Sequence, residues 1–206
     1  MPNWMHNYLT IEGPRELLDY FKAVAAQPRV IDDTGALDPN PDGLSFWNFS
    51  KPPTSKYAEY FGTNGWKDGQ KLGDSPYNWY NWNCEKWGVK WDASEVSISD
   101  NDTNLTYSFE TPWGIPDGAF KAMSAQHPDL VFEVEYQEEQ GWGGTIRYKK
   151  GKPRIIEEYS SPETHAEHEL RNQTCVCEWN DDNPNNWYDD CPDKKEALLE
   201  KEKENE

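Results

Sequence analysis

Hydrophobic residues recur at two spacings in the first 160 residues, and each spacing predicts a different element. Leu17, Phe21 and Val24 stand three or four positions apart, which predicts an amphipathic helix over residues 14–26. Phe120 and Met123 mark a second helix, residues 115–126. Alternating hydrophobic and polar positions predict half-buried strands. The predicted strands are residues 7–12, 94–99, 104–110, 130–137, 145–149 and 154–159.

The order of these elements predicts the fold class. Strand, helix, two strands, helix and strand form the split βαββαβ arrangement of an α+β, ferredoxin-like antiparallel sheet. Two further strands after residue 144 form C-terminal hairpins that widen the sheet. We therefore expect one domain over residues 1–159, with both helices on the same face of the sheet.

A long tryptophan-rich insertion, residues 27–93, separates the first helix from the second strand. Repeated prolines and glycines interrupt any regular pattern in its first part. Residues 44–49 (LSFWNF) fit a short strand or an aromatic plug, and residues 77–87 (YNWYNWNCEKW) fit a helix that ends at Gly88. We expect the insertion to pack on the domain.

Charge and composition narrow the function. The 206 residues carry 20 Lys and Arg against 38 Asp and Glu, a formal charge of −18. Such a chain is repelled by nucleic acids and by anionic membranes, so its expected charge partners are basic proteins, polycations or metal ions. High charge often signals disorder, but 11 Trp, 11 Tyr and 7 Phe indicate a core of aromatic rings. Neither a secretory signal nor a membrane-spanning run is evident, which indicates a cytoplasmic protein.

Four segments resemble a known family. MPNW with NYLTIEGP, then LSFWNFSKPP, WYNWNCEKWGVKWDA and FEVEYQEEQGWGG, occur in the order found in the YubB ferredoxin-like domain family, and they span most of residues 1–159. Met5 stands where that family usually has cysteine. The resemblance implies the ferredoxin-like fold and an origin on a plasmid or phage. It implies no activity and no catalytic residue.

The tryptophans of the insertion are candidates for a binding pocket. Aromatic walls suit a planar or cationic ligand, and Lys90 would neutralise an anionic one. Alternatively, the tryptophans fasten the insertion to the sheet, and Lys90 stacks on rings. The candidate residues are Trp79, Trp82, Trp87, Lys90, Trp91 and Trp142.

The acidic tail, residues 160–206, holds a candidate metal site. His165 and His168 share a helical face, and Cys175 and Cys177 offer two thiolates, with Cys191 as a fifth ligand candidate. A zinc ion would help the tail to fold. Neither the spacing of the two histidines nor that of Cys175 and Cys177 matches a zinc finger. The alternative is a tail that needs no cofactor and is docked or partly disordered.

Catalytic motifs are missing from the sequence: it has neither a nucleophile elbow, nor a phosphate loop, nor a zinc-protease helix. Glu133 and Glu135, with Glu138 and Glu139, would suit a glycosidase or a cation site next to a glycine turn. Solvated surface explains the same cluster in a chain with 38 acidic residues.

Our leading hypothesis is a non-catalytic accessory protein of a phage or plasmid that binds a basic host protein in the bacterial cytoplasm. Its acidic surface would inhibit a nucleic-acid-binding or defence protein, for example a nuclease. The alternative is a small-ligand binding or sequestering protein with a tryptophan-lined pocket. A third hypothesis is a hydrolase that uses the acidic residues of the late hairpin.

Overall fold

The chain divides into two compact units in a computed structural model. One unit comprises Met1–Glu139 and Gly144–Glu158, and the other comprises Gln140–Gly143 and Tyr159–Glu206. The structure describes residues 3–38, 43–62, 66–67, 70–71, 75–164, 166–167 and 183–204.

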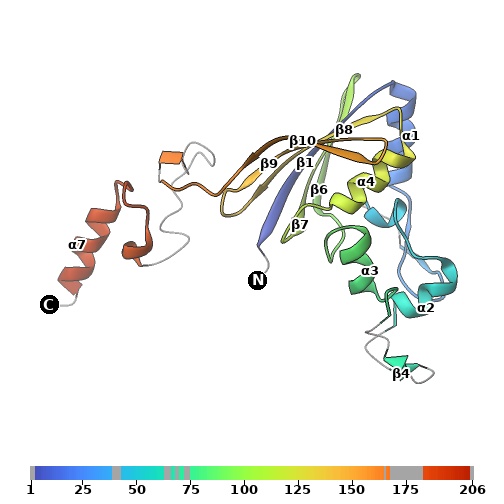
Figure 1. Ribbon diagram of the computed structural model, residues 1–206, viewed down its shortest axis with the longest axis horizontal. Helices are drawn as coiled ribbons and strands as arrows, with labels where there is room; N and C mark the ends of the chain where they lie inside the picture. The colour runs from blue at the N-terminus through green and yellow to red at the C-terminus, as the bar shows by residue number, and fades with distance from the viewer. Residues whose placement is uncertain are drawn as a thin grey trace. The chain divides into compact units, whose positions relative to one another are not determined.

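A six-stranded sheet in the order β10-β9-β8-β1-β7-β6 forms the first unit (Figure 1). The central strand β1 pairs antiparallel with β7 on one side and with β8 on the other, and β6 pairs antiparallel with β7. The strands are β1 (Trp4–Glu12), β6 (Ser94–Asp100), β7 (Asn104–Pro112), β8 (Val131–Glu138), β9 (Gly143–Lys149) and β10 (Lys152–Tyr159). The order β8-β1-β7-β6 is that of a split βαββαβ sheet, so the fold predicted from the element order is confirmed.

Two helices, α1 (Arg15–Ala25) and α4 (Asp117–Gln126), lie against the same face of the sheet (Figure 1). Phe21 of α1 packs on Tyr107 and Phe132, with ring centroids 6.2 and 5.4 Å apart. Phe120 of α4 packs on Phe109, which stands two positions from Tyr107 in β7 and therefore points to the same side. Other fully buried side chains of this core are Met5, Leu9, Ile11, Leu18, Met123 and Val134.

Several predicted boundaries differ from the structure by a few residues, and two of them have a clear physical cause. The first strand begins at Trp4 and not at residue 7, because β7 continues to Pro112 and supplies a partner that far. The second helix begins at Asp117 and not at residue 115. Pro116 restricts Ile115 to extended conformations, so the helical turn starts after the proline.

The insertion contains short elements that pack on both helices. They are β2 (Arg29–Val30), β3 (Leu37–Asp38), η1 (Phe46–Asn48), η2 (Thr54–Lys56), α2 (Tyr57–Tyr60), β4 (Trp66–Lys67), β5 (Gln70–Lys71) and α3 (Trp79–Lys86). Of the two alternatives for residues 44–49, the structure shows the aromatic plug: Phe46 and Trp47 are buried in a 3-10 turn. Asn48 donates hydrogen bonds to the carbonyls of Ala25 and Gln27, which fixes the plug at the end of α1.

The second unit includes η4 (Pro184–Asn186) and α7 (Lys194–Glu204). Lys194 donates to the carbonyl of Trp187 at 2.9 Å and to the carboxylate of Asp189 at 2.7 Å. These bonds close the turn that precedes α7. Among the described residues, no helix is long and apolar enough to cross a membrane.

Candidate functional site: a tryptophan-lined cleft

A cleft with a volume of about 270 Å³ lies beside α3, in the first unit. Its walls come from β2, η1, α2, α3 and the segment that leads into β6. The residues that line it are Arg29, Val30, Ile31, Trp47, Tyr60, Phe61, Trp79, Asn83, Trp87, Lys90, Trp91 and Asp92.

Local sequence signals position α3 at this cleft. The side chain of Asn78 accepts a hydrogen bond from the backbone N–H of Tyr80, which caps the N-terminus of the helix. Gly88 ends the helix with φ of +92°, a left-handed conformation that glycine adopts without strain. The predicted helix end at Gly88 is therefore confirmed.

Asn83 holds three segments together at the base of the cleft. Its side-chain oxygen accepts from the hydroxyl of Tyr60 at 2.9 Å, and its amide donates to the carbonyl of Lys90 at 2.9 Å. The residue is buried. Asn83 therefore joins α2 and the segment after Gly88 to α3.

The tryptophans of the cleft fall into two groups. Trp47 and Trp87 are buried, and the indole N–H of Trp87 donates to the carbonyl of Ser50 at 2.7 Å. Trp79 and Trp91 keep 38% and 41% of their surface exposed. The first pair is buried where the insertion packs, as one of our alternatives states, whereas the second pair is partly exposed. The Trp91 ring also contacts Trp4, with ring centroids 6.1 Å apart.

Two cations line the cleft beside one carboxylate. The Lys90 ammonium lies 3.9 Å from the ring centroid of Trp91. The Arg29 guanidinium lies 3.7 Å from Asp38 and 4.0 Å from Asp92, longer than a direct hydrogen bond. The donors of Arg29 are therefore not committed to those carboxylates.

Asp92 has a structural role. Its carboxylate accepts from the hydroxyl of Ser45 at 2.5 Å, from the N–H of Phe46 at 2.7 Å and from the N–H of Ala93 at 2.9 Å. Burial raises the pKa of Asp92, and these hydrogen bonds act in the opposite direction. The side chain thus ties the start of η1 to the segment before β6.

Trp113 is a neighbour of the cleft that the sequence analysis missed. It is 55% exposed, and its ring stacks on Trp91 with centroids 6.4 Å apart. The Lys90 ammonium lies 4.3 Å from the Trp113 ring centroid, so Lys90 contacts both rings. Trp113 has φ of +61°, which is uncommon for a bulky residue and places its ring outside β7. No local pattern signals that geometry.

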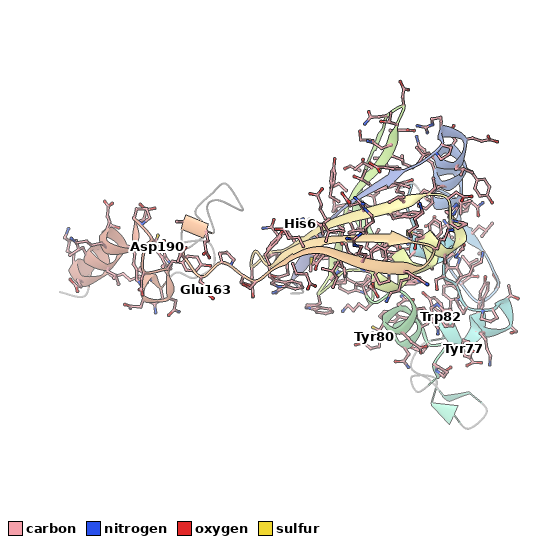
Figure 2. All side chains as sticks on the ribbon, turned by 45° about the horizontal axis from the view of Figure 1, so that its top comes forward. His6, Tyr77, Tyr80, Trp82, Glu163 and Asp190 are labelled. Atoms are coloured by element: carbon pink, nitrogen blue, oxygen red, sulfur yellow. The ribbon has the colours of Figure 1, made fainter. Side chains whose placement is uncertain are left out.

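The other predicted binding residues lie elsewhere. Trp82 stacks on Tyr77 with ring centroids 5.7 Å apart, and both lie near Tyr80 at α3 (Figure 2). Glu133 and Glu135 are on the sheet face opposite the helices, which also carries His6 (Figure 2). Glu133 forms an ion pair with Arg147. None of these residues lines the cleft, and Trp142 belongs to the second unit.

The zinc hypothesis falls largely on residues outside the described ranges. These are His165, His168, Cys175 and Cys177, whereas Cys191 is described and buried. Within the described part of the chain, no group of three or more His, Cys, Asp or Glu side chains is arranged to hold a metal ion. Zinc therefore stays a prediction for the tail.

Comparison with known proteins supports the fold. The family model of the ferredoxin-like domain in Api92-like protein matches residues 86–178, which include β6, β7, α4, β8, β9 and β10. The chain is thus an α+β protein with a ferredoxin-like domain. The match supports the ferredoxin-like part of the resemblance, and the YubB name stays an expectation.

A solved structure is also similar to this chain. The crystal structure of a protein Api92 from Yersinia pseudotuberculosis shares 12% sequence identity with it and has a TM-score of 0.47. The similarity covers 79% of this chain and 99% of that one. No curated protein matches the chain.

Proposed function

We propose that this chain is a non-catalytic binding protein whose ligand is a planar aromatic anion held in the tryptophan-lined cleft. One observation carries the proposal: exposed rings of Trp79 and Trp91 line a cleft that also holds Lys90 and Arg29. A small-ligand binding protein with a tryptophan-lined pocket was our alternative hypothesis. The concave shape of the cleft favours it over our leading hypothesis, an acidic protein that binds a basic host protein.

The rings supply shape selectivity. Stacking between a planar ligand and an aromatic side chain is worth about 1–3 kcal/mol for nucleic-acid bases, and any flat ring system presents the same surface. The cleft volume of about 270 Å³ is near the lower end of ligand pockets, roughly 300–1,000 Å³. A ligand of two or three rings suits this size.

The local charges supply the preference for an anion. The whole chain has a charge of −18, yet the cleft lining has two cations against one carboxylate, that of the partly buried Asp92. The oxygens of Asp92 already accept three hydrogen bonds, so they are poor partners for a cationic ligand. The cations available to an anionic group are the loosely paired Arg29 and Lys90, whose ammonium lies on the rings of Trp91 and Trp113.

Fluorescence titration with two probes tests this function. 1-Anilinonaphthalene-8-sulfonate is an aromatic anion with a flat naphthalene ring, and N-phenyl-1-naphthylamine has the same rings without the sulfonate. We expect the anion to bind at least about tenfold more tightly, because a charge-assisted contact is worth about 1.5–3 kcal/mol. Equal affinity for the two probes would rule out an anion-selective site.

Matched variants locate the binding. Trp79→Ala removes a ring of the cleft, whereas Tyr80→Ala removes the next exposed ring, which is not part of the lining. For charge, Lys90→Met removes a cation of the cleft, and Lys86→Met removes a cation outside the lining as its control. The cleft variants should weaken binding of the anion about tenfold, within the range for one stacking or charged contact. Similar losses in the two control variants would show that the probe binds elsewhere.

A second candidate function rests on the charge distribution. Residues 160–206 contain 14 acidic residues against five Lys and Arg, so half of the charge of −18 lies in this segment. We propose that it contacts a basic host protein, as our leading hypothesis states for a phage or plasmid accessory protein. Capture from host lysate should yield nucleic-acid-binding proteins in 0.1 M salt and lose them in 0.5 M salt, because screening weakens exposed charge pairs. Capture that is unchanged in 0.5 M salt would contradict this candidate.

A further inference from the structure

Strand β10 lies at one edge of the six-stranded sheet, in the part that the structure describes, and its outer side has no neighbouring strand. All residues from Lys152 to Glu158 are exposed. Ile155 and Ile156 keep 56% and 47% of their surface in water. An edge with exposed β-branched residues is a template for pairing with another strand.

The sequence of β10 is complementary to itself. Cations, Lys152 and Arg154, precede the two isoleucines, and the carboxylates Glu157 and Glu158 follow them. An antiparallel copy of the same strand therefore brings the basic half of one strand opposite the acidic half of the other.

The register of such a pair follows from strand geometry. In an antiparallel ladder, two directly opposite residues are either both hydrogen-bonded across the ladder or both not. Neighbouring residues of one strand differ in this respect, so a residue cannot lie opposite the copy of its neighbour. The two-fold axis therefore passes midway between the two copies of a single residue. An axis at Ile156 places Ile156 opposite its own copy and Arg154 opposite Glu158. Because these three residues are two positions apart, they share one face of the sheet.

We propose that two copies of this chain associate through β10 edges in an antiparallel, two-fold symmetric pair centred on Ile156. Two opposite-charge pairs of Arg154 with Glu158 then flank a central pair of isoleucines. The two sheets become one continuous sheet. Pro153, which lacks a backbone donor, lies outside the paired residues 154–158. This association is independent of the cleft and of its ligand.

Sedimentation equilibrium of the full chain in 0.15 M salt tests the proposal. Screening at this ionic strength, with a Debye length of about 8 Å, limits the repulsion between two chains of charge −18. We expect a reversible dimer. Glu158→Arg should raise its dissociation constant about tenfold, because symmetry places two like-charge pairs in the interface.

Two further variants decide between this interface and a general charge effect. Arg154→Glu combined with Glu158→Arg restores both opposite-charge pairs and should return the dissociation constant to within about twofold of the parent. Glu135→Arg makes the same change of charge on an interior strand and should leave it unchanged. A monomeric parent chain, failure of the double variant to restore the dimer, or an equal loss in Glu135→Arg would overturn the proposal.

Discussion

Replacing Trp87 with alanine tests whether burial separates the structural tryptophans from the ligand-facing ones. Trp87 is 3% exposed, its ring meets Phe46 edge-on at 5.8 Å, and its N–H donates to the carbonyl of Ser50. Trp91 stands four positions away and lines the same cleft, but it is 41% exposed. Trp91→Ala is therefore a matched comparison.

The burial of each indole sets the expected magnitudes. A buried aromatic ring removes about 150–250 Å² from water, and about 25 cal/mol per Å² gives roughly 4–6 kcal/mol. Measured losses for Trp→Ala in cores are about 3–5 kcal/mol, so we expect about 4 kcal/mol for Trp87→Ala. Trp91 keeps two-fifths of its surface in water, which reduces the expected loss to about 2–3 kcal/mol.

Urea unfolding followed by far-ultraviolet circular dichroism measures both losses. Domains are stable by about 5–15 kcal/mol, so a loss of about 4 kcal/mol leaves most such domains folded in water. Trp87→Phe is an intermediate variant, because it keeps an aromatic ring but leaves the Ser50 carbonyl without its donor. Loss of that donor should lower the free energy of unfolding by about 1–3 kcal/mol. If Trp91→Ala destabilised the chain as much as Trp87→Ala, the division of the tryptophans by burial would be wrong.

Two further predictions concern the supports of the cleft. A Cβ atom at Gly118 in α4 would clash with the Lys86 carbonyl at the end of α3, so Gly118→Ala should lower the free energy of unfolding in urea by about 1–3 kcal/mol. The control is Gly114→Ala, whose Cβ atom meets nothing within 4 Å and should change that free energy little. Equal losses in the two variants would refute the close approach of the two helices. Because burial raises the pKa of Asp92 in the folded state, its stabilising effect is complete below the unfolded value of about 3.9 and is lost as pH rises through the folded pKa. The parent should therefore lose stability relative to Asp92→Asn as the pH rises above about 4, and parallel pH profiles would contradict that direction.

The sheet and its two helices were predictable because each strand or helix carries its own pattern. Residues 130–137 alternate, and the structure buries Leu130, Phe132, Val134 and Tyr136 on one side as predicted. Polar turn residues between residues 99 and 104 favour the hairpin of β6 and β7 that the structure shows. Local periodicity and turn chemistry determine these features, so one sequence is enough to find them.

The cleft was predictable only in part. Trp79, Trp87, Lys90 and Trp91 follow one another in the sequence, and the short helix α3 brings them to one cleft. Arg29 comes from β2, about 60 residues earlier, and its position depends on how the insertion folds back. Trp82 does not line the cleft, because the helix turns it toward Tyr77, and its part in binding stays a prediction. Tertiary packing decides both cases, and it leaves no local signal.

Direct observation of the tryptophan side chains in the presence of the anionic probe tests the central claim. In a proton–nitrogen correlation spectrum of the full chain, each indole N–H gives one signal, which is assigned by Trp→Phe variants. Titration with 1-anilinonaphthalene-8-sulfonate should move the signals of Trp79 and Trp91 and leave that of Trp82 in place. If the Trp82 signal moves while those of Trp79 and Trp91 stay unchanged at saturation, the ligand does not occupy the cleft.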